Sequence, residues 1–356
     1  FTSALEPANM EMHEAMKAPD KKQLMKGMVK EVESQQDNEH WELKKRSSIP
    51  AGKKVLPAVW AMKRKRRIAT QEVYKWKARL NIHGGKQTKG VDYWETYSPM
   101  VTWNSIRTFL TLAIVNDWHT RQLNFVLAYP QADVECDMYV EIPKGFEFKG
   151  SRKTHCLKLL RNIYGQKQAG RVWQQHLFEG LREMGFEQSK TDECVFYKGQ
   201  TAFMVYTDDG IFCGPDKDEI DTIIKEMGKR FNITDEGTID EYLGVKVTHL
   251  PDGRITLTQP HLIDSIIKDM GFRENTKGKP TPAPSTILLQ RDEQGDSHDE
   301  VWEYRSILGK LNFLEKSTRP ELAYSGHQCT RFCSDPKASH SAVARHIMWY
   351  LMDTRD

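Results

Sequence analysis

The stretch from Phe203 to Cys213 restricts the fold and chemistry of this chain more than any other. Two runs of apolar and aromatic residues flank two adjacent carboxylates, Asp208 and Asp209, and a glycine. Such runs on either side of Asp-Gly predict a β-hairpin with its turn at that dipeptide. Adjacent carboxylates repel each other, so a tip of this kind either lies in water or holds divalent cations. The stretch alone leaves both interpretations open.

The composition describes a globular protein. The chain has 356 residues, of which 38% are hydrophobic and 28% charged, enough for two or three subdomains with their own cores. Its apolar runs are too short to span a membrane, and its start resembles no signal peptide. The chain lacks an initiator Met, so we expect it to be cut from a longer precursor.

The six cysteines are scattered along the chain, which predicts free thiols. An alternative is a zinc site near the C-terminal end. Its candidate ligands are His327, Cys329, Cys333, His340 and His346. No two of them form a CxxC pair, so ordinary core and surface roles are favoured.

Positive charge is concentrated between residues 41 and 90. This segment holds fifteen Lys or Arg and two acidic residues, a net charge of +13 within a chain of +3. Lys75, Lys77 and Arg79 alternate with aromatic and apolar residues, so a strand would place all three cations on one face. Such a face can grip phosphates; a solvated, lysine-rich surface is the plainer alternative.

The order of predicted elements indicates an α+β fold. A helix follows Pro19-Asp20, and another spans 104–116. The middle of the chain then reads as a strand (121–129), a helix ending near Met184, the acidic hairpin, a helix (216–231) and a further strand. This βαββαβ order predicts a split sheet. A hairpin over 242–257 and amphipathic helices complete the chain.

Several motifs, taken in order, resemble the reverse transcriptase region of Copia-type LTR retrotransposons over nearly the whole chain. They are the segments 41–43, 74–80, 92–99, 122–125, 163–173, 206–209, 242–244, 304–309 and 318–324. The resemblance implies a right-hand polymerase with basic fingers, a palm built on the ferredoxin-like split sheet, and a helical thumb. The expected parts are an N-terminal extension with fingers (1–120), a palm (121–258, with a fingers insertion about 136–165) and a helical thumb or connection (259–356). No RNase H domain is expected.

The resemblance also implies a catalytic metal site. Nucleotidyl transfer onto a primer 3′-hydroxyl uses two Mg²⁺ or Mn²⁺ ions held by carboxylates from two strands. Asp208 and Asp209 match the hairpin half of that site. The family has Asp where this chain has Asn124, and a neutral amide holds two cations less well. We therefore expect severely impaired catalysis, on the order of a hundredfold or more.

Other roles follow from the resemblance, each beside a simpler reading. Tyr129 would block a ribose 2′-hydroxyl, or is a core aromatic. Phe125 and Gln168 would contact the incoming nucleotide, although Gln168 also suits a helix start. Lys77 or Arg79 would meet the triphosphate. Tyr242, Leu243 and Gly244 would support the primer terminus, or pack as an ordinary strand.

The implied partners are an RNA or DNA template-primer, deoxynucleoside triphosphates and other parts of a Pol or Gag polyprotein, with no membrane. The implied location is a cytoplasmic virus-like particle, and the basic run from Lys63 to Arg67 alternatively suits a nuclear signal. Two other functions compete with an RNA-directed DNA polymerase. One is a nucleic-acid-binding or structural remnant without catalysis; the other, a two-metal nuclease, lacks a further carboxylate at recognisable spacing.

Overall fold

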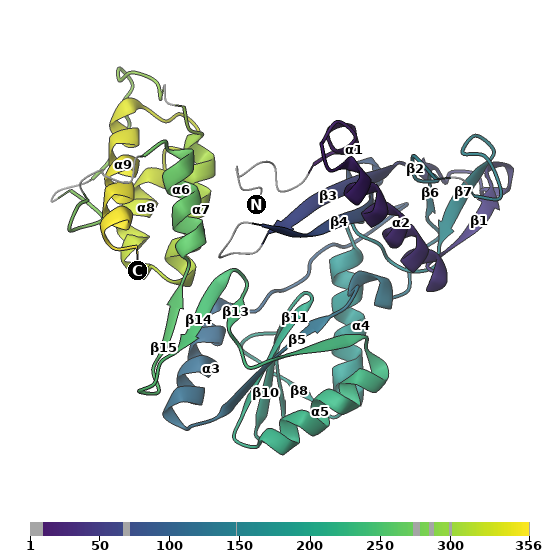
Figure 1. The fold of residues 1–356 in the computed structure, drawn as a ribbon, viewed down its shortest axis with the longest axis horizontal. Helices are drawn as coiled ribbons and strands as arrows, with labels where there is room; N and C mark the ends of the chain where they lie inside the picture. Colours follow the sequence, from purple (N-terminus) through teal and green to yellow (C-terminus); the bar gives the residue numbers. More distant parts are fainter. Residues whose placement is uncertain are drawn as a thin grey trace. The chain divides into compact units, whose positions relative to one another are not determined.

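The computed structural model describes residues 10–66, 72–146, 148–272, 278–284, 288–298 and 301–355 (Figure 1). The chain divides into an N-terminal unit, Pro7–Ile239, and a C-terminal unit, Asp240–Asp356. We describe each unit by itself. Of the predicted basic run, Arg67 lies outside the described residues. The three-part division into fingers, palm and thumb remains a prediction; the hairpin after residue 240, assigned there to the palm, groups with the C-terminal helices.

The helices of the N-terminal unit are α1 (Met12–Ala15), α2 (Lys21–Asp37), α3 (Trp103–Val115), α4 (Ala169–Glu183) and α5 (Lys217–Arg230), with the short 3₁₀ helices η1 (Arg46–Ser48), η2 (Gly84–Lys86) and η3 (Tyr129–Gln131). Its strands are β1 (Trp41–Lys45), β2 (Val55–Leu56), β3 (Ala58–Arg66), β4 (Val73–Ile82), β5 (His119–Phe125), β6 (Tyr139–Val140), β7 (His155–Leu159), β8 (Glu187–Gln188), β9 (Val195–Lys198), β10 (Thr201–Tyr206), β11 (Asp209–Gly214) and β12 (Ile233–Gly237).

The six-stranded sheet of the N-terminal unit has the order β12-β5-β11-β10-β9-β8. The strands β12, β5, β11 and β10 are joined by two of the helices. Along the chain these elements run β5, α4, β10, β11, α5, β12. The β10–β11 hairpin therefore lies beside β5 with β12 on the far side, which is the split βαββαβ arrangement. The predicted α+β class and the predicted split sheet are confirmed.

Aromatic side chains fill the space between this sheet and α4. Phe125 meets Trp173 and Phe231 edge-on, with ring centroids 5.2 and 5.8 Å apart. At Gly180 of α4 an added Cβ would lie 2.4 Å from the Phe231 ring, so the helix needs glycine there. Since successive side chains of a strand point to opposite faces, the inward turn of Phe125 sends Asn124 to the face away from α4.

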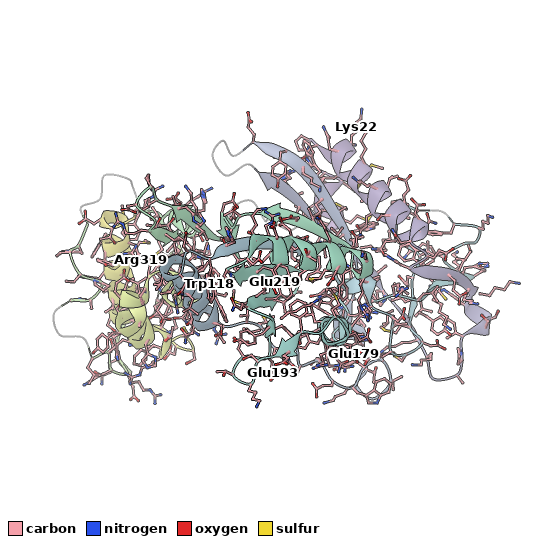
Figure 2. The ribbon with its side chains drawn as sticks, turned by 90° about the horizontal axis from the view of Figure 1, so that it is seen from below. Lys22, Trp118, Glu179, Glu193, Glu219 and Arg319 are labelled. Carbon is pink, nitrogen blue, oxygen red and sulfur yellow. The ribbon has the colours of Figure 1, made fainter. Side chains whose placement is uncertain are left out.

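Helix α2 lies on the β3–β4 hairpin. Leu24, Met28 and Val32 are buried on the helix, and Ala78 and Leu80 are buried on the strand. The helix starts after Asp20, as predicted, and its exposed residue Lys22 projects from it in Figure 2.

The carboxylate of Asp20 accepts two hydrogen bonds from Arg64 of β3, at 2.8 and 2.7 Å. That guanidinium is the main cause that holds the pKa of Asp20 well below its usual range. The odd-numbered residues of β4, from Lys75 to Arg79, lie on the face opposite Ala78 and Leu80, as the alternation predicts.

The C-terminal unit joins a small sheet to a helical core. Its elements are β13 (Glu241–Tyr242), β14 (Val245–His249), β15 (Ile255–Thr258), α6 (Pro260–Asp269), α7 (Tyr304–Ser317), η4 (Pro320–Leu322), α8 (Ala323–Thr330) and α9 (Ala338–Asp353). Residues such as Ile266, Leu314 and Ile347 are fully buried at its centre. The ammonium of Lys310, 7% exposed, is neutralised there by Asp269 and donates to Ser265 Oγ at 2.9 Å.

One predicted strand is too long. The strand expected over 121–129 ends at Phe125, because Leu127 has a φ of +53° and the 3₁₀ helix η3 begins at Tyr129. A left-handed residue breaks the extended backbone, and Pro130 offers no N–H for pairing.

The cysteines and the candidate metal ligands were also the subject of predictions. The six cysteines are free thiols, as predicted. Within the described ranges no group of three or more His, Cys, Asp or Glu could hold a metal ion, so the zinc alternative finds no support there. None of the described helices has the length and apolar character needed to cross a membrane.

Candidate active site

Asp208 and Asp209 lie at the tip of the β10–β11 hairpin. Tyr206 pairs with Asp209, so the two loop residues are Thr207 and Asp208, and Thr207 has a φ of +56°. The predicted Asp-Gly turn is therefore wrong by two residues. Gly210 belongs to β11, where an added Cβ would lie 2.6 Å from the Phe203 ring. Close packing, and not turn geometry, requires this glycine.

Two donors from other elements fix the loop backbone. The indole Nε1 of Trp173 donates to the Thr207 carbonyl at 2.7 Å. The backbone N–H of Phe125 donates to the Asp208 carbonyl, also at 2.7 Å. A left-handed β-branched residue is strained, and these bonds to the loop hold it in place. The helix α4 and the strand β5 thus determine where the carboxylates lie.

Asn124 lies directly opposite Asp209 in the β5–β11 pair. Its amide Nδ2 donates to Asp209 Oδ1 at 3.2 Å. The structure therefore brings Asn124 and Asp209 into contact, with Asp208 next to Asp209 in the hairpin loop. Metal binding by these three residues stays a prediction. An amide in this position replaces the repulsion between two facing carboxylates with a hydrogen bond.

The side chains of Asn124, Asp208 and Asp209 are the candidate ligands for divalent cations. Two carboxylates and one amide oxygen are ligands that Mg²⁺ accepts, so the residue types of Asp208, Asp209 and Asn124 suit one ion, although Asn124 here turns its Nδ2 toward Asp209. Among the described residues no third carboxylate, His or Cys joins the group. The residues therefore do not supply the three negative charges that the resemblance implies for a pair of ions.

An arginine and two tyrosines, Arg79, Tyr164 and Tyr129, pack together. The Arg79 Cζ is 4.6 Å from the centroid of the Tyr164 ring, and that ring is 5.3 Å from the Tyr129 ring. Burial raises the pKa of the Tyr129 phenol above its usual range, and the charge of Asp208 raises it further. Burial, followed by Asp208 and Asp209, also raises the pKa of Tyr206. Arg79, Tyr164 and Tyr129 thus form one row of contacts.

Other residues predicted for nucleotide contact have structural partners. Gln168 is 1% exposed; its amide donates to the Asp92 carbonyl at 3.2 Å and accepts from Gln87 at 2.9 Å. The side chain of Phe125 is buried against Trp173, and Lys77 lies half-buried on the same face of β4 as Arg79. Contact of Gln168, Phe125 or Lys77 with a nucleotide stays a prediction.

The residues predicted at the primer terminus lie in the C-terminal unit. Tyr242 pairs with Val245, so Leu243 and Gly244 form a two-residue hairpin turn. Their φ values are +51° and +78°, as expected for the two central residues of a type I′ turn. Tyr242 is 1% exposed. These positions make a tight, well-defined corner, and its contact with a primer stays a prediction.

Sequence reasoning did not assign roles to Tyr164 and Trp173. Both lie inside the 163–173 motif, so the signal was present in the sequence. What the sequence did not contain is the contact of Tyr164 with Arg79 and the hydrogen bond from Trp173 to Thr207, which join residues far apart in the chain.

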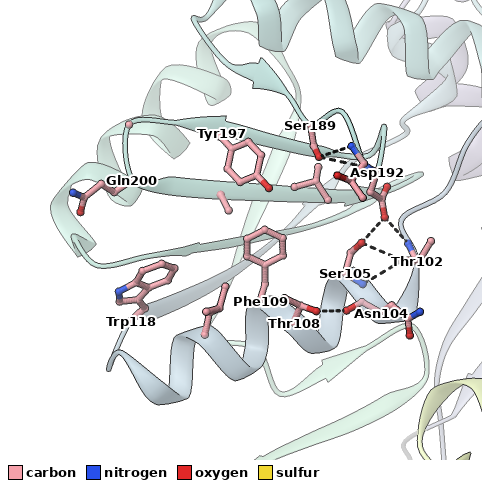
Figure 3. Close-up of a pocket in the computed structure, with 15 residues that line it drawn as sticks. Thr102, Asn104, Ser105, Thr108, Phe109, Trp118, Ser189, Asp192, Tyr197 and Gln200 are labelled. Carbon is pink, nitrogen blue, oxygen red and sulfur yellow. Dashed lines mark hydrogen bonds between the residues drawn. The ribbon is translucent and has the colours of Figure 1, made fainter.

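A cavity of about 680 Å³ lies between α3 and the strands β9 and β10 (Figure 3). Its walls include Phe109, Trp118 and Tyr197, and none of the predicted site residues lines it. At its rim Asp192 accepts from Ser105 Oγ at 2.6 Å and from the Thr102 N–H at 3.1 Å. The carboxylate of Asp192 therefore ties α3 to the loop before β9.

Comparison with known proteins identifies the family. The family model described as reverse transcriptase (RNA-dependent DNA polymerase) matches residues 38–284. The chain is 31% identical over 355 residues to the "Retrovirus-related Pol polyprotein from transposon TNT 1-94" of Nicotiana tabacum. That alignment covers 96% of this chain and 26% of the relative. It is 29% identical over 352 residues to the corresponding polyprotein from transposon RE1 of Arabidopsis thaliana, covering 98% of this chain and 23% of the relative.

A solved structure, the foamy viral protease-reverse transcriptase in complex with double-stranded DNA, aligns with 92% of this chain and 48% of its own, at 12% identity and a TM-score of 0.45. The chain spans about a quarter of the length of the curated relatives it matches. The family match over most of the chain, with the split sheet and its carboxylate hairpin, places the chain in the reverse transcriptase (RNA-dependent DNA polymerase) family, as the reverse transcriptase region of a Copia-type Pol polyprotein.

Proposed function

We propose that this chain binds a template-primer and deoxynucleoside triphosphates, and that it extends the primer weakly because Asn124 replaces a carboxylate. The observation that carries the proposal is the pairing of Asn124 with Asp209, next to Asp208, on adjacent strands. This is where carboxylates from two strands would meet to hold cations for nucleotidyl transfer. Other parts of a Pol polyprotein would act beside it.

The chain's own residues have distinct roles in this proposal. Asp208 and Asp209 hold a divalent cation, Mg²⁺ or Mn²⁺, which when bound activates the primer hydroxyl and neutralises phosphate charge. The Trp173 and Phe125 bonds fix the loop that presents them. Arg79, packed on the Tyr164 ring, meets the triphosphate. Tyr129, whose ring packs on that of Tyr164, would contact the sugar and exclude a 2′-hydroxyl.

The role of Asn124 follows from charge. A carboxylate there would face Asp209 and share cations with it, whereas the amide supplies a single neutral oxygen. Loss of one unit of charge at a preorganised site weakens transition-state stabilisation by a few kcal/mol, about a hundredfold in rate or more. The pair of ions that the family's chemistry calls for would then form poorly.

Primer extension on an RNA template in Mg²⁺ or Mn²⁺ tests the proposal. We expect slow extension by the unmodified chain and a gain of about a hundredfold in the Asn124→Asp variant. The matched control is Gln122→Glu, which adds the same charge two residues earlier on the same strand face. Asn124→Asp that binds template-primer and leaves extension undetectable would refute the catalytic assignment.

A second candidate is a nucleic-acid-binding remnant without catalysis. The hydrogen bond from Asn124 to Asp209 favours it, because the amide stabilises the site without any cation. This candidate predicts tight template-primer binding by the unmodified chain with no extension in either metal. It also predicts that Asp208→Asn leaves that binding unchanged.

A further inference from the structure

The Arg79 guanidinium packs on an aromatic ring. Its Nε is buried without a hydrogen-bond partner among the described residues. Its Cζ lies 4.6 Å from the centre of the Tyr164 ring, within the range of a cation–π contact. A guanidinium directed by a ring keeps its N–H groups and its charge for an anionic ligand.

The backbone at Tyr164 is itself fixed by the strand that carries Arg79. The backbone N–H of Ile82, in β4, donates to the Tyr164 carbonyl at 2.9 Å. Gly165 follows with a φ of +86°, and an added Cβ there would lie 2.2 Å from the Ile82 carbonyl oxygen. A Cβ at Gly84 would likewise lie 2.3 Å from the Gly165 carbonyl oxygen. The backbone of Tyr164 and Gly165 therefore packs directly against the end of β4. Only glycine at positions 84 and 165 permits the two backbones to lie this close.

The other side of the Tyr164 ring meets Tyr129. The two ring centroids are 5.3 Å apart, with the planes inclined at 55°. Burial raises the pKa of both phenols, and the charge of Asp208 adds to the increase in each. A continuous set of contacts runs from Arg79 through Tyr164 to Tyr129.

We propose that Tyr164 is a positioning residue of the nucleotide pocket, and that its ring aims the Arg79 guanidinium at the phosphates of a nucleoside triphosphate. The inference rests on the proposed function. It goes beyond that function by naming a residue that acts on the nucleotide through Arg79. The hydroxyl of Tyr164 is dispensable for this role, whereas its ring is essential.

The test measures equilibrium binding of dTTP, with Ca²⁺ to prevent turnover, to the chain bound to template-primer. Tyr164→Leu should weaken dTTP binding about tenfold, and Tyr164→Phe should stay within about twofold of the unmodified chain, since it keeps the ring. The matched control is Tyr197→Leu, because Tyr197 is a 40% exposed tyrosine on β9, outside the proposed pocket. It should leave dTTP binding unchanged.

A double variant tests whether Tyr164 acts through Arg79. Arg79→Gln should weaken dTTP binding, and adding Tyr164→Leu to it should cause no further loss. Equal affinities in the Leu and Phe variants would overturn the inference, and so would independent, additive losses in the double variant. Thermal unfolding of each variant shows that the binding was measured on folded protein.

A spectroscopic readout covers the case in which Tyr164→Leu does not fold. In the unmodified chain, the proton–nitrogen resonance of the Arg79 Nε should lie upfield of ordinary arginine signals because of the Tyr164 ring current. Arg79→Lys identifies the resonance by removing it. A signal at the ordinary arginine position would overturn the inference. If dTTP binds as expected while Asn124→Asp gives no primer extension, the polymerase proposal fails and the role of Tyr164 stands. An unmodified chain that binds no dTTP overturns both.

Discussion

At the level of single residues, Asn124 and Asp209 face each other across two strands, joined by one hydrogen bond of 3.2 Å. Asn124→Asp should therefore lower the stability of the folded chain, independently of any effect on catalysis. Without divalent cations the facing carboxylates repel each other, and we expect the free energy of unfolding to fall by about 1–2 kcal/mol. Added Mg²⁺ should restore that loss by binding the folded state.

Urea unfolding with and without Mg²⁺ measures this effect. Gln122→Glu is again the matched control, since Gln122 faces Ile211 and not a carboxylate across the β5–β11 pair. An equal response of the two variants to Mg²⁺ would contradict a cation site at Asn124 and Asp209.

Gly210 gives a second prediction at the same scale. An added Cβ would lie 2.6 Å from Phe203 Cε2 and 3.2 Å from Leu123 Cδ1. Both neighbours are fully buried, so Gly210→Ala should overpack the core and lower the free energy of unfolding by about 1–3 kcal/mol. Chemical denaturation measures the change.

The control for Gly210 is another glycine of the same unit. Gly228 lies exposed within α5, where an added Cβ would meet Ile233 only at 4.0 Å. Gly228→Ala should raise the free energy of unfolding by about 0.5–1 kcal/mol through helix propensity. Destabilisation of the same size at both positions would show that space around Gly210 is not the cause.

At the level of elements, His40 joins α2 to the sheet that contains β1 and β7. Its Nδ1 lies 2.6 Å from Gln35 Oε1 of α2, and its carbonyl accepts from the N–H groups of Leu160 and Arg161. Burial, with a smaller contribution from Arg161, lowers the pKa of His40 to about 4. The folded state therefore keeps the imidazole neutral at pH values where the unfolded chain protonates it.

This difference in pKa has a definite sign. Stability is fully present above the unfolded pKa of about 6.5 and falls as the pH drops toward 4, because the unfolded state binds the proton more readily. The loss over this window should reach about 3 kcal/mol. Denaturation measured between pH 7 and 4 checks it. His40→Gln should flatten this part of the pH profile, and His13→Gln, at an exposed histidine of α1, should not.

Elements with a clear period were predictable from the sequence. Ile106 and Leu110 recur at helical spacing, and α3 spans Trp103–Val115 against an expected 104–116. The alternation along β4 likewise placed Lys75 and Arg79 on one face. The turn at Thr207 was not predictable, because Asp-Gly is the stronger local signal and packing of Gly210 against Phe203 overrides it. The Arg79–Tyr164 contact depends on tertiary structure alone.

At the level of the whole chain, charge is distributed very unevenly. Residues 41–90 carry +13, so the rest of the chain carries −10. We expect template-primer affinity to fall steeply with salt, with a log–log slope near −0.9 for each phosphate contacted. Reversal of two cations on β4, Lys75→Glu and Lys77→Glu together, should weaken binding and reduce that slope by about 2.

Fluorescence anisotropy at several salt concentrations measures both quantities. Lys225→Glu with Lys229→Glu, two exposed cations of α5, is the control with the same change in net charge. Equal effects of the two double variants would mean that overall charge, and not the β3–β4 hairpin, governs binding.

The hydrogen bond between Asn124 and Asp209 joins residues 85 positions apart, which has a consequence for the order of folding. The β10–β11 hairpin is local and can form within microseconds, whereas its pairing with β5 must close a long loop first. A partly folded chain can therefore display both aspartates at a hairpin tip before the hairpin pairs with β5, although β5 precedes it in the sequence. The site becomes complete only when β5 pairs with β11, so its formation reports the assembly of the six-stranded sheet.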